Sequence, residues 1–310
     1  MIKNYKLYTI LVILYSFCQN YINGQDNNII LAEQSQNRIV IINPFSDSII
    51  WQWKADNSLK SSDHTKWFNA PSDAKPVLGG NYLLISASGG GVALIRVRDG
   101  KTLFYTYVGG NTHSSEILPD GNIVCASSTG NFLTIVRTDT ILFPDTVLKK
   151  QIRIPFAHNV VWDNERQVLY TASTNKLYTL KYNFNCNNPK LEITDSIIIP
   201  ENEAHDLFPV LDEDALWLTT SESIFKFNVL SEKFLELNID NDCNIKSVSS
   251  GQGKMPVIII RPKESWWTDE VLDINNNSIF IKEGFKIYKA RWYVNNEFSY
   301  GRINHFHFCK

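Results

Sequence analysis

A short phrase that recurs six times constrains the fold of this chain more than any other feature of its sequence. Each copy opens with a basic or imidazole side chain, continues through a few mostly apolar positions to a turn, and ends in a second apolar strand. Successive copies start 38, 45, 47, 41 and 43 residues apart, at Lys75, His113, His158, His205, Lys246 and Lys289. Four antiparallel strands with tight turns take about 40–45 residues, the length of one propeller blade. The repeat therefore predicts an all-β propeller.

The turns inside these copies carry the residues that a β-hairpin needs. Examples are Pro119-Asp-Gly121, Gly79-Gly-Asn81 and Asp163-Asn164, which supply positive-φ or Asx-turn positions. The flanking runs are rich in Val, Ile, Leu, Tyr and Trp, as strands are. One such run, Trp266–Asp269, is expected to be a strand in which at least one Trp packs between blades.

The sixth copy reaches the end of the sequence at Lys310 before a blade is complete. The N-terminal segments 28–32, 38–42 and 48–53 are strand-like and supply what is missing. We therefore expect six blades, with N-terminal strands joining the C-terminal strand so that no sheet edge is left free. The alternative is seven blades, which needs another inner strand from Asn304–Phe308.

The first 24 residues resemble an export signal. Lys3 and Lys6 precede an apolar run, Leu7–Cys18, that has the length of a signal-peptide core and is short for a membrane span. Cleavage near Gly24 would leave a single propeller domain, 25–310, in the periplasm or at the cell surface. A lipoprotein anchored through Cys18 is the alternative, although Phe17 is a poor small-residue site. No later segment has the pattern of a transmembrane span.

Composition and cysteine usage narrow the function classes. The chain is 44% hydrophobic and 20% charged, as a large packed domain is, and its net charge of -2 gives no reason to expect nucleic acid as a partner. Cys125 lies in an apolar run and is expected to be a buried thiol. An oxidising compartment permits a disulfide, for which Cys186 with Cys243 is one candidate pairing.

The first strand of each propeller blade lines the central channel, so the six residues that open the copies are expected to form a ring. Three imidazoles would then lie on consecutive blades and three lysines on the other half. Arg291, two residues after Lys289, would point the same way and either extend the basic wall or pair with a neighbouring carboxylate. Trp67 lies in the loop before Lys75 and would either offer an aromatic face to a sugar or simply cover a blade edge.

Four interpretations of this ring stay open at the level of sequence. The side chains could satisfy turn and backbone groups. Alternatively, partly protonated imidazoles and the basic residues could hold a carboxylate, sulfate or phosphate; the basic residues are Lys75, Lys246, Lys289 and Arg291. His113, His158 and His205 could ligate a divalent metal ion such as Zn or Mn. One of the same histidines could act directly as a general acid or base.

Several motifs resemble an uncharacterised family of secreted bacterial β-propeller proteins that carries a domain-of-unknown-function label. They are Ser86–Arg96, Gly109–Glu116, Leu118–Ser128, Trp266–Asp269 and Lys289–Tyr293. The resemblance spans nearly the whole mature chain and implies a propeller and export, but no activity. The stretch Val92–Leu103 is also loosely similar to quinoprotein-type propeller repeats, although no residues here support a quinone cofactor. The histidine set is similar in its placement to that of oligogalacturonate lyase, a propeller that holds a metal this way, but this is analogy at the level of fold.

These observations lead to two functional hypotheses. The first is a carbohydrate-active protein that acts on an acidic saccharide at the channel mouth, by lyase-type β-elimination or by hydrolysis. The second is a non-catalytic propeller that binds a glycan or a protein partner. The sequence leaves the substrate, the metal and the oligomeric state open.

Overall fold

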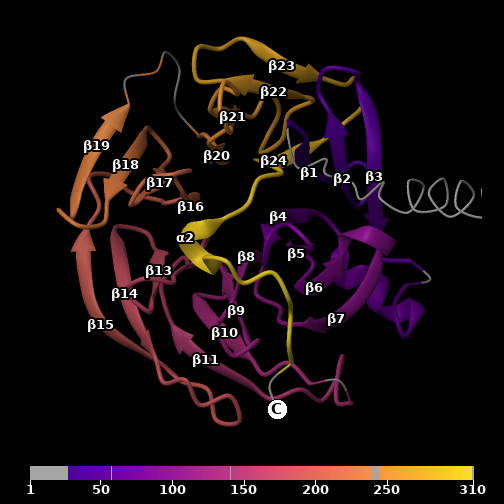
Figure 1. The fold of residues 1–310 in the computed structure, drawn as a ribbon, viewed down its shortest axis with the longest axis vertical. Coiled ribbons are helices and arrows are strands. Elements are labelled where there is room, and N and C mark those ends of the chain that lie inside the picture. The colour runs from indigo at the N-terminus through magenta and orange to yellow at the C-terminus, as the bar shows by residue number, and fades with distance from the viewer. Residues whose placement is uncertain (1–26, 57, 140, 238, 240–243, 309–310) are drawn as a thin grey trace, which may run out of the picture.

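The computed structural model describes residues 27–308 except 57, 140, 238 and 240–243. Six four-stranded antiparallel sheets are arranged as blades around a central axis (Figure 1). This confirms the expected six-bladed propeller. The proposed signal peptide, 1–24, and Cys18 lie outside the described residues, so the export and lipoprotein hypotheses stay predictions. Among the helices that the structure describes, none has the length and hydrophobicity of a membrane-spanning segment.

The blades are numbered here from the N-terminus, and each is given from its inner to its outer strand. Blade 1 contains β24 (Ile287–Trp292), β1 (Ile29–Glu33), β2 (Arg38–Asn43) and β3 (Ser48–Lys54). Blade 2 contains β4 (Pro71–Val77), β5 (Tyr82–Ala87), β6 (Gly91–Arg96) and β7 (Lys101–Tyr107). Blade 3 contains β8 (Thr112–Ile117), β9 (Ile123–Ser127), β10 (Phe132–Val136) and β11 (Lys149–Arg153).

Blade 4 contains β12 (Val161–Asp163), β13 (Val168–Ala172), β14 (Lys176–Tyr182) and β15 (Leu191–Ile198). Blade 5 contains β16 (Asp206–Pro209), β17 (Ala215–Thr219), β18 (Ile224–Asn228) and β19 (Lys233–Leu237). Blade 6 contains β20 (Ser247–Ser249), β21 (Ile258–Ile260), β22 (Glu270–Asp273) and β23 (Ser278–Ile281). Short helices occur at η1 (Ser62–Phe68), η2 (Val97–Asp99) and α2 (Glu297–Tyr300).

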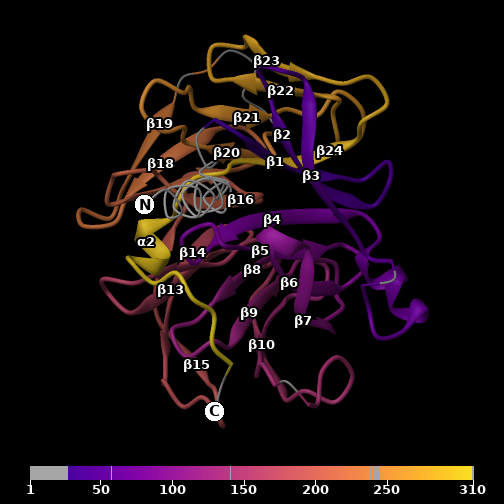
Figure 2. The same cartoon turned by 45° about the vertical axis from the view of Figure 1, so that its right-hand side comes forward.

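Blade 1 closes the ring by joining the two ends of the chain. Strand β24 pairs antiparallel with β1, with Ile29 opposite Trp292 and Leu31 opposite Ala290. The segment Asn304–Phe308 forms no strand, so the seven-blade alternative is wrong. Figure 2 shows β24 running beside β1 in the same blade.

Apolar packing between blades explains why the middle strands are hydrophobic on both faces. Every residue of β5, Tyr82–Ala87, is buried, because its sheet lies between two neighbouring sheets. Ile39 and Ile41 of blade 1 belong to the same cluster as Leu83 and Ile85 of blade 2. The outer strand β15, by contrast, is largely exposed. The core is therefore a ring of inter-blade layers around the polar channel.

The cysteines take two different states. Cys125 in β9 is a buried free thiol, as expected, and burial raises its pKa to about 12. Cys186 is disulfide-bonded. Cys243 and Cys309 lie outside the described residues, so the pairing of Cys186 with Cys243 stays a prediction.

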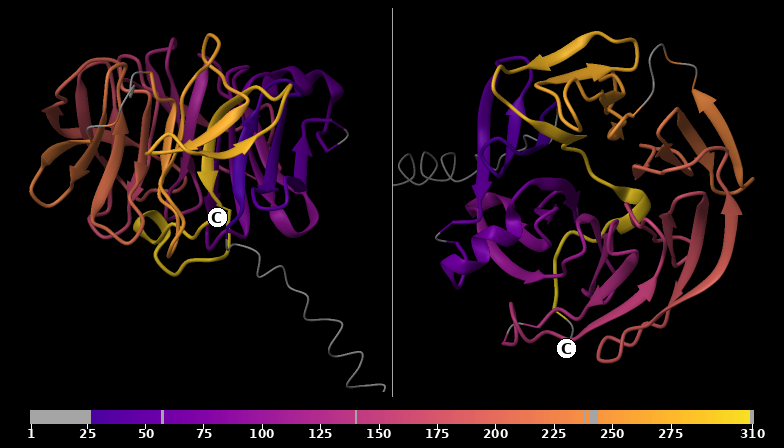
Figure 3. Two further views of the ribbon diagram at one scale, coloured as in Figure 1. Left: turned by 90° about the horizontal axis from the view of Figure 1, so that it is seen from above. Right: turned by 180° about the vertical axis from the view of Figure 1, so that it is seen from behind.

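The segment after β24 crosses the axis at the end where the inner strands finish (Figures 1 and 3). The Tyr293 hydroxyl donates to the Gly80 carbonyl at 2.5 Å, and the Asn164 amide donates to the Phe298 carbonyl at 3.0 Å. Farther along, the Asn81 side chain donates to the Asn304 carbonyl at 2.9 Å. We call residues 293–308 the C-terminal plug.

Four buried charges cross the channel and form what we call the ion-pair layer: Asp73, Asp206, Lys289 and Arg291. Two nitrogens of Arg291 each donate to Asp206 at 2.6 Å, and Arg291 also donates to Asp73 at 3.3 Å. Lys289 donates to Asp206 at 2.9 Å. Burial opposes ionisation of Asp206, but Arg291 and Lys289 outweigh it and hold the pKa of that carboxyl well below its usual range. The closing strand β24 is thereby tied to blades 2 and 5.

Replacing Asp206 with Asn is expected to lower the free energy of unfolding by about 3 kcal/mol or more, because two buried cations lose their main counter-charge. Urea denaturation followed by circular dichroism measures this. Asp195→Asn, on the exposed strand β15, is the matched control and should be near neutral. Equal stability of the two variants would contradict a structural role for the layer.

Candidate functional site

The three histidines from consecutive copies of the repeat lie together at one end of the channel. His113 is the second residue of β8, while His158 and His205 precede β12 and β16. The ring centroids of His113 and His158 are 4.4 Å apart, and those of His158 and His205 are 5.5 Å apart. This end is opposite the C-terminal plug, because the inner strands start here and finish there. We call it the histidine mouth, made of His113, Phe156, His158, His205, Lys246 and Tyr288.

Phe156 and Tyr288 complete this mouth and were not anticipated from the sequence. Phe156 has a φ of 54°, and its amide donates to Asn131 Oδ1 at 3.0 Å. Its ring then lies 4.1 Å from that of His158. A bulky residue is uncommon in this left-handed region, and the bond to Asn131 helps to hold the backbone there.

Tyr288 reaches the channel because of a bulge in the closing blade. The pairing of β1 with β24 shifts register between Ala32 and Glu33, which leaves Tyr288 without an opposite residue. A bulge re-aims side chains, so both Tyr288 and its neighbour Lys289 can face the channel. The Tyr288 hydroxyl lies 3.1 Å from Nδ1 of His113. Strict alternation along a strand would have placed Tyr288 on the other face.

Lys246 and His205 form a hydrogen-bonded pair in this mouth. The distance between Lys246 Nζ and His205 Nε2 is 3.2 Å. An ammonium group has no lone pair, so the protonated lysine donates and Nε2 accepts. The proton of a neutral His205 then sits on Nδ1, which is buried and has no hydrogen-bond partner among the described residues. The pair therefore leaves one buried donor unsatisfied.

All three imidazoles are neutral near pH 7. Burial, followed by Lys289 and neighbouring groups, lowers the pKa of His113 to about 3. Burial and then Lys246 lower the pKa of His205 to about 3 as well. The pKa of His158 also lies well below its usual value, through burial and then His113. Neutral imidazoles offer both a donor and an acceptor.

Lys246 carries a positive charge that no carboxylate in the described part of the channel balances. Within the ion-pair layer, two cations face two carboxylates. Lys246 lies above that layer and makes no ion pair in the described part of the chain. Burial, and then Lys289, lower its pKa to about 8, although the exposed Glu203 at the rim acts in the opposite direction. The histidine mouth thus has an excess of positive charge at neutral pH.

The structure separates Lys75 and Arg291 from the histidines and places Lys289 directly below them, with its Nζ 3.5 Å from the His205 carbonyl, so the expected ring of six is not formed. Lys75 Nζ donates to the Val160 carbonyl at 2.6 Å and lies 3.4 Å from Glu116 Oε2. The bulges near Pro71 and Thr112 fall at equivalent places in β4 and β8, so the strand pairing puts Lys75 level with Glu116 and not with His113. Lys289 and Arg291 are in the ion-pair layer.

Glu116 and Lys75 belong to the plugged end of the channel. The Tyr300 hydroxyl of α2 donates to Glu116. Burial raises the pKa of Glu116 to about 7, against the opposing effect of Lys75. Glu116 is therefore a contact of the plug and does not join the histidines.

Trp67 lies on the outside of blade 2. Its ring stacks on His64 at 3.9 Å and packs 5.6 Å from Tyr107 in the outer strand β7. This geometry matches the alternative in which Trp67 covers a blade edge.

The histidine set does not have the geometry of a metal centre. Within the described residues, no group of three or more His, Cys, Asp and Glu side chains is arranged to hold a metal ion. His113 and His158 lie ring beside ring at an interplanar angle of 34°, and the accepting nitrogen of His205 faces Lys246. Glu116 and Asp206 are the carboxylates nearest in sequence to His113 and His205, but neither is available as a further metal ligand, because each is bonded elsewhere. We therefore derive no chemistry through a metal.

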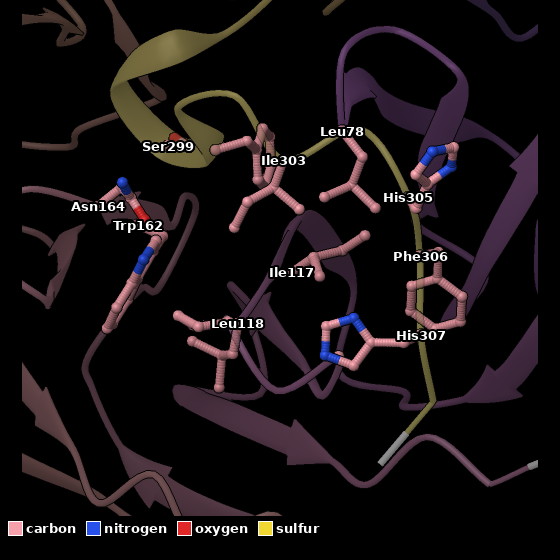
Figure 4. A pocket seen from close by; sticks show the side chains of 13 residues that line it. Leu78, Ile117, Leu118, Trp162, Asn164, Ser299, Ile303, His305, Phe306 and His307 are labelled. Carbon is pink, nitrogen blue, oxygen red and sulfur yellow. The ribbon is translucent and has the colours of Figure 1, made fainter. Parts of the chain in front are cut away.

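Two hollows lie at the plugged end. One is a small pocket of about 20 Å³ beneath the plug, where Ile117, Leu118 and Ile303 line its wall (Figure 4). The other, of about 240 Å³, lies between α2 and blades 4, 5 and 6, with Phe208 and Phe298 among its walls. Neither contains a residue of the histidine mouth.

Two solved structures have a fold similar to that of this chain. A crystal structure of a protein of unknown function from Bacteroides caccae has a TM-score of 0.55 and 16% identity, over 85% of this chain and 97% of that one. Inactive virginiamycin B lyase from Staphylococcus aureus, solved with quinupristin, has a TM-score of 0.51 and 14% identity, over 83% of this chain and 84% of that one. At these identities the likeness shows the fold alone.

No curated protein sequence is detectably related to the chain. A family model described as a family of unknown function matches residues 17–309. On that match, the chain belongs to the DUF6528 family.

Proposed function

We propose that this chain is an exported propeller that binds an acidic saccharide at the histidine mouth. One observation carries the proposal: Lys246 is a buried cation without a carboxylate partner in the described channel, and the His205 ring that it bonds through Nε2 has an unsatisfied Nδ1 on its opposite edge. A buried donor without a partner costs about 1–3 kcal/mol. A ligand carboxylate would supply the missing charge at Lys246, and a separate ligand oxygen would supply the acceptor that Nδ1 lacks.

The rest of the mouth suits a saccharide better than a simple inorganic anion. His158 Nδ1 donates to the Phe156 carbonyl at 3.3 Å, so its Nε2 can accept from a ligand hydroxyl, and His113 keeps Nε2 for one ligand hydrogen bond because its Nδ1 contacts the Tyr288 hydroxyl. Phe156 and Tyr288 add apolar ring surface beside them. A ligand with one carboxylate, several hydroxyls and a C–H face would use all of these groups, whereas phosphate or sulfate would use the charge alone.

β-Elimination is the catalytic form of this proposal. A base removes the proton at C5 of a uronate, the C4–O bond breaks, a C4=C5 double bond forms, and the leaving oxygen takes a proton. His113 or His158, both neutral, would be the base, and the bound carboxylate would raise the low imidazole pKa by favouring the protonated form. Burial, and then Asp206, raise the pKa of Tyr288, which keeps its hydroxyl protonated and able to supply the second proton. Without turnover, the same contacts serve a binding protein.

Replacing Lys246 with Met should weaken binding of uronate oligosaccharides at least tenfold, because a charge-assisted contact is lost from a buried site. Isothermal titration calorimetry with galacturonate, glucuronate and mannuronate oligomers measures this. Lys254→Met, an exposed lysine near the other end of the channel, is the matched control. If wild-type protein binds none of these oligomers, or if both variants bind like wild type, the proposal fails.

The catalytic form makes its own prediction about the products. Wild-type protein should generate the ultraviolet absorbance of an unsaturated uronate. A double variant that combines His158→Ala with Tyr288→Phe should abolish this absorbance. Tight binding with no new absorbance from any oligomer would leave binding as the function and exclude the elimination.

Saccharide binding should also weaken at alkaline pH. The pKa of Lys246 is lowered to about 8, so the cation is present below that pH and is lost above it. A bound carboxylate favours the protonated lysine, so the dissociation constant should be flat from about pH 6 to 7.5 and then rise about tenfold per pH unit above 8. Titrations in matched ionic strength across this range test it. A dissociation constant that stays flat to pH 10 would contradict the role of Lys246.

A further inference from the structure

An exposed tryptophan stands at the rim of the histidine mouth. Trp266 lies in the connection between β21 and β22, on the same face as the histidines, and 55% of its surface is exposed. The expected strand over Trp266–Asp269 is not formed. Residues 264–267 instead make a tight turn in which the Trp267 amide donates to the Glu264 carbonyl at 3.0 Å. Trp266 therefore projects outward and does not pack between blades.

The indole of Trp266 is held in place from below. Its Nε1 donates to Gln34 Oε1 at 3.0 Å, and Gln34 Nε2 donates to the Pro71 carbonyl at 3.0 Å. The backbone N–H of Gln34 also donates to the Lys286 carbonyl at 2.8 Å. These bonds join the indole to the starts of two inner strands, β4 and β24. An exposed tryptophan on such a support is a preformed surface that loses little side-chain entropy when it is covered.

The same rim is continuous with the histidine mouth. Thr268 and Ile287 exchange backbone hydrogen bonds of 3.1 and 2.7 Å, and the residue after Ile287 is Tyr288, which contacts His113. Two residues of extended chain span about 7 Å, so Trp266 lies within reach of a short oligosaccharide held at the mouth. Lys286 Nζ lies 4.5 Å over the ring of the neighbouring Trp267, which adds a positive charge to this rim.

We propose that Trp266 forms a second sugar subsite, which stacks against the pyranose face of a residue adjoining the acidic residue in the mouth. This inference rests on the proposed function. The indole supplies a broad apolar face with its polar edge already satisfied by Gln34, so a ligand with a C–H face can cover it without burying an unpaired group. Lys286 favours an acidic chain over a neutral one. The occupant is therefore a further residue of the same acidic saccharide.

Binding as a function of oligomer length tests the subsite. We expect wild-type protein to bind a uronate trimer or tetramer at least tenfold more tightly than the monomer. Trp266→Ala should remove that gain and leave affinity for the monomer within twofold of wild type, while Trp266→Phe should keep most of it. Phe45→Ala, an aromatic that is 70% exposed in the turn between β2 and β3 on the opposite face, is the control and should change neither affinity. Thermal denaturation confirms that each variant is folded.

The outcomes separate the two proposals. If wild-type protein binds the oligomers and Trp266→Ala binds them equally well, the subsite is overturned and saccharide binding at the mouth stands. If Trp266→Ala weakens monomer and tetramer to the same extent, Trp266 belongs to the mouth and the second subsite is also overturned. If wild-type protein binds no acidic saccharide of any length, both proposals fail.

Discussion

The ion pairs inside the channel are the constraint on which the rest of this propeller depends. Arg291 holds Asp206 with two hydrogen bonds and also reaches Asp73, while Lys289 adds a third cation-to-carboxylate hydrogen bond to Asp206. Both cations come from β24, the strand that closes the ring. A closed propeller must bring its last strand to its first, and here that strand is also tied across the channel to blades 2 and 5. Buried charges are unfavourable unless fully paired, so these contacts favour one arrangement of the blades over others.

The equal number of cations and carboxylates in the ion-pair layer also determines the electrostatics of the histidine mouth. Two cations and two carboxylates neutralise one another at mid-channel, so the electrostatic character of the mouth depends on the groups above them. Those groups are Lys246 and three imidazoles that burial keeps neutral. If the histidines were charged, the mouth would be a dense cluster of cations. Because they are neutral, the mouth has one dominant charge, on Lys246, beside imidazole nitrogens and a tyrosine hydroxyl that can form hydrogen bonds. The proposed recognition of a hydroxylated anion depends on this arrangement.

Much of this architecture could be predicted from the sequence, because it depends on local and periodic signals. The spacing of the phrases, the turn residues and the strand-like segments at both ends together indicate six blades with a shared closing blade. The gathering of His113, His158 and His205 follows from the same repeat. The depth of each residue in the channel does not, because the copies were aligned on their basic residues, whereas the strand pairing places Lys75 level with Glu116 and deeper than His113. Tyr288 was missed because a bulge in β24 turns it toward the channel.

Other features had no sequence signal at all. Arg291 and Asp73 are 218 positions apart, and nothing near either one indicates the other. Phe156 is positioned by a left-handed backbone and by Asn131, neither of which a hydrophobic pattern can reveal. Trp266 looked like a packing residue because aromatic pairs in strands usually are. Its exposure depends on a tight turn at Ser265, which has a φ of 50°.

The C-terminal plug closes the axis of the ring at the end opposite the histidines. Tyr300 bonded to Glu116, with Lys75 beside them, fills the axis at the far end. A polymer cannot thread through such a ring, so a ligand bound at the histidines would leave by the route it entered. A long glycan would consequently be engaged by a terminus or a protruding branch, and release of the occupant would compete directly with the arrival of the next one.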